Sequence, residues 1–146
     1  MTKGENMNSD KVMKDILLST KTIASVGLSS NPAKESYGIV RYLKSQGYRI
    51  IPVNPTATEI LWEKSYPDLE SVPEKIDVVQ IFRKPEDVPP VVDSAIKVGA
   101  KVVWMQEGIV NEEAAQKARD AGLQVVMDAC MRATHQRLIG PKPMSI

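Results

Sequence analysis

The chain has little of what several classes of protein require. Its 146 residues include one cysteine, Cys130, so no internal disulfide can form, which favours a reducing compartment. One cysteine and one histidine are too few to suggest a zinc site. No apolar run approaches the length of a membrane span, and the first ten residues lack the apolar segment of a signal peptide. We therefore expect a cytoplasmic protein with no metal and no membrane partner.

An excess of charge of either sign is also lacking. The chain has 19 lysines and arginines against 18 aspartates and glutamates, for a formal net charge of +1. Proteins that bind nucleic acid usually present a basic face, often interleaved with aromatic side chains. Neither feature is present, so nucleic acid is not expected as a partner.

What the sequence does contain is a regular alternation of apolar runs and amphipathic segments. Strands are expected at 22–26, 48–53, 76–82, 101–105 and 123–127. Helical patterns lie between them, with predicted N-terminal caps at Ser9 or Asp10, Ser36, Asp87 and Asn111, and a short helix follows the last strand. This order predicts an α/β fold, a single Rossmann-like domain with a mainly parallel five-stranded sheet flanked by helices. We expect the domain to span residues 9–140, between a loose tail at 1–8 and a C-terminal tail at 141–146.

The stretch from Thr22 to Gly38 has the pattern of a strand, a loop of small residues and the start of a helix. Such a unit directs free backbone N–H groups and the positive end of a helix dipole toward one point, which suits a phosphate. The classical dinucleotide fingerprint is absent, because Gly27 stands alone. The second strand ends in Asn54-Pro55 rather than in the acid that would hold a ribose. Phosphate binding is therefore supported, and classical NAD binding is not.

In a parallel sheet, the ligand crevice lies beyond the carboxyl ends of the strands. Five segments follow the predicted strands and should converge there: Gly27 to Asn31, Asn54-Pro55, Phe82 to Pro85, Gln106 to Gly108 and Asp128 to Cys130. One of them carries two cations, Arg83 and Lys84, which makes it a candidate for phosphate contact.

These segments and the framework between them resemble a known family, the small stand-alone CoA-binding proteins of Rossmann type. That family is related to the nucleotide domain of the succinyl-CoA ligase alpha subunit. The matching pieces are VGLSSNPAKESYGIVRYLKSQGYRIIPVNP, YPDLESVPEKIDVVQIFRKPEDVPPVV and GAKVVWMQEGIVNEEAAQKARDAGLQVVMDACM. They occur in order and cover residues from about 21 to 140. The sequence departs from the family at Trp62, where a glycine is usual.

The resemblance implies coenzyme A, or an acyl-CoA, as the ligand, and it implies where the ligand would lie. The loop after the first strand would receive the pyrophosphate, with Asn54 and Pro55 beside the adenosine. The segment that begins with Phe82 would flank the adenine and phosphates, and the segment with Glu107 would lie near the pantetheine arm. The cofactor-binding residues so predicted are Gly27, Ser29, Ser30, Asn31, Asn54, Pro55, Phe82, Arg83, Lys84, Glu107 and Gly108, with Lys34 as a further cation in the first loop.

No catalytic residues are predicted. The single histidine, His135, has no serine or cysteine partner at a suitable spacing, and Cys130 resembles a small buried side chain. The residues therefore favour a binding module over an enzyme. Two alternatives stay open: a subunit of a CoA-ligase-type enzyme that needs a partner chain, and a nicotinamide-nucleotide-dependent enzyme. The sequence also leaves open a homo-oligomer or a partner protein.

Overall fold

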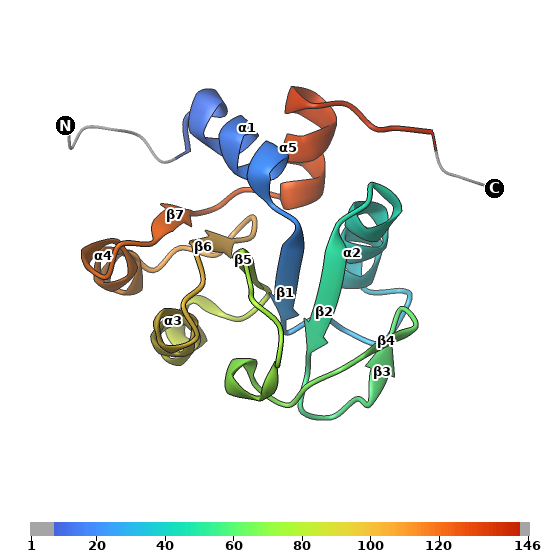
Figure 1. Cartoon of the computed structure of the whole chain (residues 1–146), viewed down its shortest axis with the longest axis horizontal. Coiled ribbons are helices and arrows are strands. Elements are labelled where there is room, and N and C mark those ends of the chain that lie inside the picture. Colours follow the sequence, from blue (N-terminus) through green and yellow to red (C-terminus); the bar gives the residue numbers. More distant parts are fainter. Residues whose placement is uncertain (1–7, 144–146) are drawn as a thin grey trace.

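Five parallel strands form one sheet at the centre of the chain (Figure 1). The structure, a computed structural model, describes residues 8–143; the rest of the two predicted tails, 1–7 and 144–146, lies outside the described residues. The strands are β1 (Thr22–Val26), β2 (Arg49–Val53), β5 (Val78–Ile81), β6 (Val102–Met105) and β7 (Gln124–Val126). Their order across the sheet is β2-β1-β5-β6-β7. The predicted Rossmann-like fold with a five-stranded parallel sheet is confirmed.

The strands consist largely of consecutive apolar residues, as expected for a parallel sheet that is covered on both faces. Every residue of β5 and β6 is buried. At the middle of the sheet, Ala24 of β1 stands opposite Ile51 of β2 and Val79 of β5. Pro52 lies in β2, an edge strand, where a missing N–H donor is tolerated.

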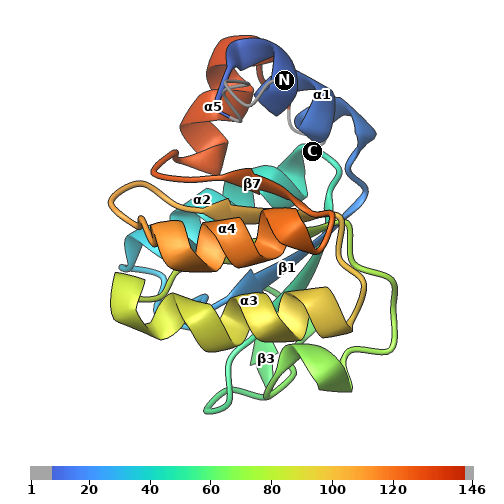
Figure 2. The same ribbon diagram turned by 90° about the vertical axis from the view of Figure 1, so that its left-hand side faces the viewer.

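Helices cover the two faces of the sheet in two layers (Figure 1, Figure 2). One face packs against α3 (Val88–Lys97) and α4 (Glu112–Asp120). The other packs against α1 (Asp10–Ser19), α2 (Glu35–Ser45) and α5 (Met131–Leu138). None of the helices in residues 8–143 is long and apolar enough to cross a membrane.

Of the four predicted helix caps, two are confirmed, one is wrong and one is confirmed in position only. The side chain of Ser9 accepts a hydrogen bond from the N–H of Val12, and that of Asn111 accepts one from Ala114. Ser36 does not cap α2, since the helix begins one residue earlier, at Glu35, after Lys34. Asp87 precedes α3 as predicted, but its side chain makes no capping bond.

A small hairpin follows β2 and extends the edge of the molecule. It consists of β3 (Glu59–Ile60) and β4 (Glu63–Lys64), joined by Leu61 and Trp62. Both joining residues have a left-handed backbone, with φ of 55° and 64°. This conformation favours glycine, so Trp62 occupies a backbone position that is unfavourable for a large side chain. Two 3-10 turns, η1 (Leu69–Ser71) and η2 (Pro85–Asp87), complete the connections.

Candidate functional site

The order of the strands places a crevice between β1 and β5. After β1 the chain crosses to β2 on one side, and after β2 it returns to β5 on the other side of β1. The connections leaving β1 and β5 therefore diverge, and a parallel sheet binds its ligands at such a switch point. Gly27 follows β1 and Phe82 follows β5, so both loops lie at this point.

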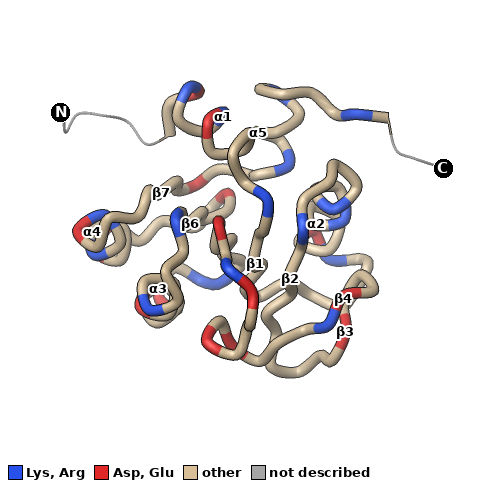
Figure 3. The backbone as a smooth tube through the Cα atoms, in the orientation of Figure 1, with Lys and Arg blue, Asp and Glu red and all other residues tan. Residues whose placement is uncertain are grey.

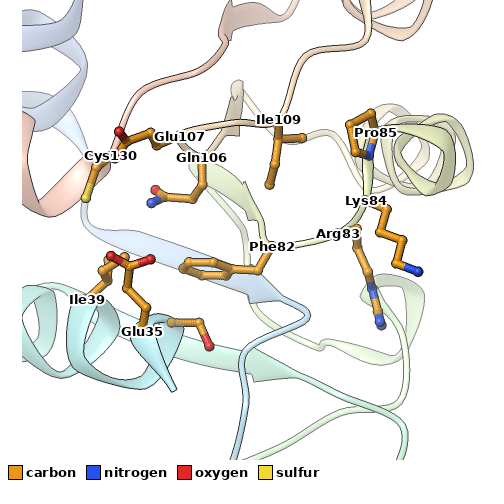
Figure 4. Close-up of a pocket in the computed structure, with 11 residues that line it drawn as sticks. Glu35, Ile39, Phe82, Arg83, Lys84, Pro85, Gln106, Glu107, Ile109 and Cys130 are labelled. Carbon is orange, nitrogen blue, oxygen red and sulfur yellow. The ribbon is translucent and has the colours of Figure 1, made fainter. Parts of the chain in front are cut away.

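A cavity of about 320 Å³ opens beside this crevice (Figure 4). Its lining comes from four separate parts of the chain: the start of α2, the connection after β5, the connection after β6 and the residue before α5. The lining residues are Glu35, Ser36, Ile39, Phe82, Arg83, Lys84, Pro85, Gln106, Glu107, Ile109 and Cys130. We call this cavity the cleft.

The two ends of the cleft differ in charge. Arg83 and Lys84 lie at one end, and Cys130, Glu107 and Glu35 lie at the other (Figure 4). Among residues 8–143, no carboxylate lies within ion-pair distance of either cation. The cationic end is therefore open to an anionic group such as a phosphate.

A second, smaller cavity of about 170 Å³ meets the cleft at Arg83. It lies at the carboxyl ends of β1 and β2, where Val26 and Val53 contribute to its lining, and Leu69 and Val91 add further apolar surface. Asp68 and Ser94 add polar groups to this smaller cavity, and Arg83 lines both it and the cleft.

Gly27 is required by the closeness of the two loops that form the crevice. Its φ is +88°, and a Cβ atom built there would lie 2.5 Å from the carbonyl oxygen of Phe82. Real Cβ atoms do not approach a backbone oxygen so closely, so a side chain at Gly27 would force the loops apart. The glycine allows both loops to line one crevice.

The rest of the loop after β1 is held by its own side chains. The N–H of Ser29 donates to the hydroxyl of Ser36, and the N–H of Asn31 donates to the hydroxyl of Ser29. Asn31 in turn accepts from the N–H of Ala33. Ser30 is exposed, and its N–H has no hydrogen-bond partner among the described residues. Of the predicted phosphate-binding residues in this loop, Ser30 therefore offers a free backbone donor.

The connection after β2 is tied to the same loop. The side-chain amide of Asn54 donates to the carbonyl oxygen of Leu28 at 2.9 Å, and its oxygen accepts from the N–H of Thr56. Pro55 is exposed beside it. Asn54 thus joins two of the predicted segments.

Four of the predicted residues, Phe82, Arg83, Lys84 and Glu107, line the cleft together. Gly108 lies next to them, and its N–H donates to the carboxylate of Asp128 at 2.7 Å. The other predicted residues, in the loops after β1 and β2, line neither of the two cavities described above. Lys34 is exposed at the start of α2. The assignment of these residues to a ligand stays a prediction.

Sequence reasoning missed a series of hydrogen bonds between buried polar side chains that leads from β1 to the cleft. Ser25 of β1 donates to the side-chain oxygen of Gln80 in β5, and Gln80 donates to the side-chain oxygen of Gln106. The backbone N–H of Met131, the first residue of α5, donates to that same oxygen. Gln80 and Gln106 are buried within an otherwise apolar core, which is the signal that could have found them.

His135 lies away from the cleft, in the layer of α1, α2 and α5. Its ring is buried, and its Nδ1 atom lies 2.8 Å from the hydroxyl of Tyr42. Burial lowers the pKa of His135, and the charge of Lys142 lowers it further. Burial also raises the pKa of Tyr48, whose ring packs edge-on against the histidine, to about 12. The hydroxyl of Tyr42 and the Nδ1 atom of His135 thus form a hydrogen bond whose donor depends on the tautomer of the ring.

Comparison with known proteins finds a matching family model and several similar proteins. A model of the CoA binding domain matches residues 21–136. The protein YneT of Bacillus subtilis is 41% identical over 123 residues, which cover 84% of this chain and 91% of YneT. The solved structure of a hypothetical protein from Pyrococcus horikoshii has a TM-score of 0.89 and 41% identity, and the match covers 96% of this chain and 99% of that one.

A longer relative is an enzyme. The ADP-forming acetate–CoA ligase II of Archaeoglobus fulgidus is 33% identical over 102 residues. The match covers 67% of this chain but only 15% of the ligase. The region shared with that ligase is thus a small part of it.

Proposed function

Because the chain belongs to the CoA binding domain family, we propose that it binds coenzyme A, or an acyl derivative, at the carboxyl ends of its parallel sheet. The observation that carries this proposal is the pair of cations at one end of the cleft, Arg83 and Lys84, which have no carboxylate partner among the described residues. Unpaired cations that converge in a cleft are a common feature of phosphate sites.

The shape of the site matches the shape of the ligand. Coenzyme A has an adenine, a set of phosphates and a long flexible arm that ends in a thiol. The smaller cavity, with apolar surface from Val26 and Val53, suits the adenine, and Arg83, which lines both cavities, suits the phosphates. The arm would then extend along the cleft toward Glu107, and the free N–H of Ser30 would face the pyrophosphate.

A second candidate is a CoA-ligase subunit that becomes active with a partner chain. The observation that favours it is the match to acetate–CoA ligases, of which this region is a small part. Mass spectrometry of the natively purified protein would distinguish the two, because a co-purified partner subunit supports the ligase and a co-purified CoA alone supports the binding module.

Thermal denaturation tests the proposed ligand directly. A ligand present at 100 times its dissociation constant stabilises the folded protein by about 2.7 kcal/mol, which is visible as a higher melting temperature. We expect CoA to raise the melting temperature, and NAD at the same concentration to leave it unchanged, because β2 ends in Asn54-Pro55 and not in the acid that would hold the ribose of NAD. Equal shifts with the two ligands would remove the preference for CoA.

A further inference from the structure

The orientation of the Gln106 amide is determined by one backbone group. The N–H of Met131 can only donate, so the side-chain atom that faces it at 3.1 Å must be the oxygen of Gln106. The same oxygen accepts from Gln80 at 3.1 Å. Both acceptor positions of that oxygen are therefore used, and the NH₂ group of Gln106 must point elsewhere.

The NH₂ group of Gln106 points into the cleft. The residue is 4% exposed, and its side chain lines the cavity with the nitrogen directed toward the end where Cys130 lies (Figure 4). Among the described residues, this nitrogen has no hydrogen-bond partner. A buried donor without a partner is unfavourable, so this nitrogen is a site that a ligand oxygen would fill.

Cys130 lies at the same end of the cleft. It is the last residue before α5, and its thiol is partly exposed and lines the cavity with Gln106. The groups along the cleft thus follow the order of two cations, a buried amide donor and a thiol. Along CoA, the order is phosphates, amide carbonyls and a thiol.

We propose that Cys130 is a thiol-exchange site for coenzyme A, with Gln106 donating to an amide carbonyl of the pantetheine arm. This inference rests on the proposed function, since CoA must bind in the orientation set by Arg83 and Lys84. The reacting partner is a disulfide of CoA, such as CoA disulfide. The thiolate of Cys130 attacks one sulfur, the disulfide bond of the ligand breaks, and a Cys130–CoA disulfide forms. The other CoA leaves as a thiolate and takes up a proton, so no further oxidant is needed.

Intact-protein mass spectrometry without a reductant tests the exchange. Incubation with CoA disulfide should add one CoA to the wild-type protein and none to the Cys130→Ser variant. Because the cleft concentrates the reagent next to the thiol, the reaction should be at least about tenfold faster than with glutathione disulfide at the same concentration. Equal rates with the two disulfides would mean that Cys130 is an ordinary accessible thiol, and would overturn the proposal.

The role of Gln106 has its own test. Gln106→Glu keeps an oxygen for Gln80 and Met131 but replaces the NH₂ donor, so the rate with CoA disulfide should fall about tenfold while the rate with glutathione disulfide does not change. A fall with both reagents, or with neither, would remove Gln106 from the site. If circular dichroism shows that this variant does not fold, competition by S-methyl-CoA tests on the wild-type protein whether CoA disulfide reacts with Cys130 from a CoA-binding site. Excess S-methyl-CoA should slow the reaction with CoA disulfide, and no slowing would overturn the proposal.

The same samples separate this inference from the proposed function. If CoA raises the melting temperature of Cys130→Ser but the wild-type protein gains no adduct, CoA binding stands and the exchange site is wrong. If CoA raises the melting temperature of neither protein, the proposed function fails, and the exchange site fails with it.

Discussion

At the amino ends of the strands, Arg49 and Asp77 have charged partners, whereas the cations Arg83 and Lys84 at the carboxyl ends have none among the described residues. Arg49, the first residue of β2, lies between Glu63 and Glu74 at 2.6 and 2.7 Å. Asp77, just before β5, accepts hydrogen bonds from the N–H groups of Lys21 and Thr22. At the opposite edge, Arg83 and Lys84 have no such partner among residues 8–143. Lysine, arginine and acidic residues are interspersed along the whole chain, so a general excess of cations does not explain the difference (Figure 3).

The pKa shifts follow the same division. Burial alone would raise the pKa of Asp77, but the two backbone N–H groups and the charge of Lys101 hold it below its ordinary value. The hydrogen bond from Arg49 likewise lowers the pKa of Glu74. Ionised groups at the amino edge thus stabilise the folded chain. The carboxyl edge leaves its cations available, as expected where charge serves a ligand rather than the fold.

The largest expected difference is in the free energy of unfolding of two glycine variants, one at the carboxyl ends of the strands and one at the amino ends. Gly27→Ala introduces both a left-handed alanine and a contact with the Phe82 carbonyl, so it should lower the free energy of unfolding by about 2–5 kcal/mol. Gly47, just before β2, has φ of +101° but nothing within 4 Å of an added Cβ. Gly47→Ala should therefore cost only about 1–2 kcal/mol. Urea denaturation of the two variants measures both values, and equal losses would show that the crevice loops can separate freely.

Much of the fold could be predicted because its signals are local. The apolar runs identify β1 and β5, and side chains at Ser9 and Asn111 identify the starts of two helices. Each of these signals lies within a few residues of the feature that it predicts.

The cleft was predicted less completely because its groups are distant in the sequence. Ser25 and Gln80 are 55 residues apart, and Gln106 meets Met131 only when α5 packs against the sheet. Ser36 has the sequence pattern of a helix cap, but its hydroxyl accepts from Ser29 in the preceding loop. Only the three-dimensional arrangement decides between such competing partners.

Substitution of one arginine at each end of the strands separates an effect on ligand binding from an effect on stability. Arg83→Ala removes a charge-assisted contact worth about 1.5–3 kcal/mol, so the dissociation constant of CoA should rise roughly tenfold to a hundredfold. Dephospho-CoA should be affected much less if Arg83 contacts the 3′-phosphate. Arg49→Ala should leave CoA affinity unchanged and lower the free energy of unfolding by about 1 kcal/mol, since its ion pairs are half-exposed. Calorimetric titration and urea denaturation of both variants provide the two measurements.

One other outcome would reassign Arg83 within the ligand site, and a second would contradict the division between ligand binding and stability. If Arg83→Ala weakens both CoA and dephospho-CoA equally, Arg83 contacts the pyrophosphate rather than the 3′-phosphate. If it weakens neither ligand while Arg49→Ala does, the ligand site lies at the amino edge and the cleft is not the binding site.

The smallest effect concerns His135, whose buried ring lies away from the cleft in the layer of α1, α2 and α5. Histidine titrates near pH 6.5 in an unfolded chain, and burial lowers the pKa of His135 in the folded protein. Between the two values the unfolded chain binds a proton that the folded chain does not. The contribution of His135 to stability is therefore fully present above about pH 6.5 and is lost as the pH falls through that window.

Melting temperatures between pH 8 and pH 5 test this sign. Asp77 and Glu74 titrate below their ordinary values of 3.8 and 4.5, so they contribute little change in this range. The wild-type protein should lose stability on acidification, by no more than about 1.4 kcal/mol per pH unit from one group. His135→Asn places an uncharged acceptor near the hydroxyl of Tyr42, and its stability should depend less on pH. An equal slope in both proteins would mean that His135 becomes protonated without disturbing the fold, and the carboxylates would then have to account for the loss.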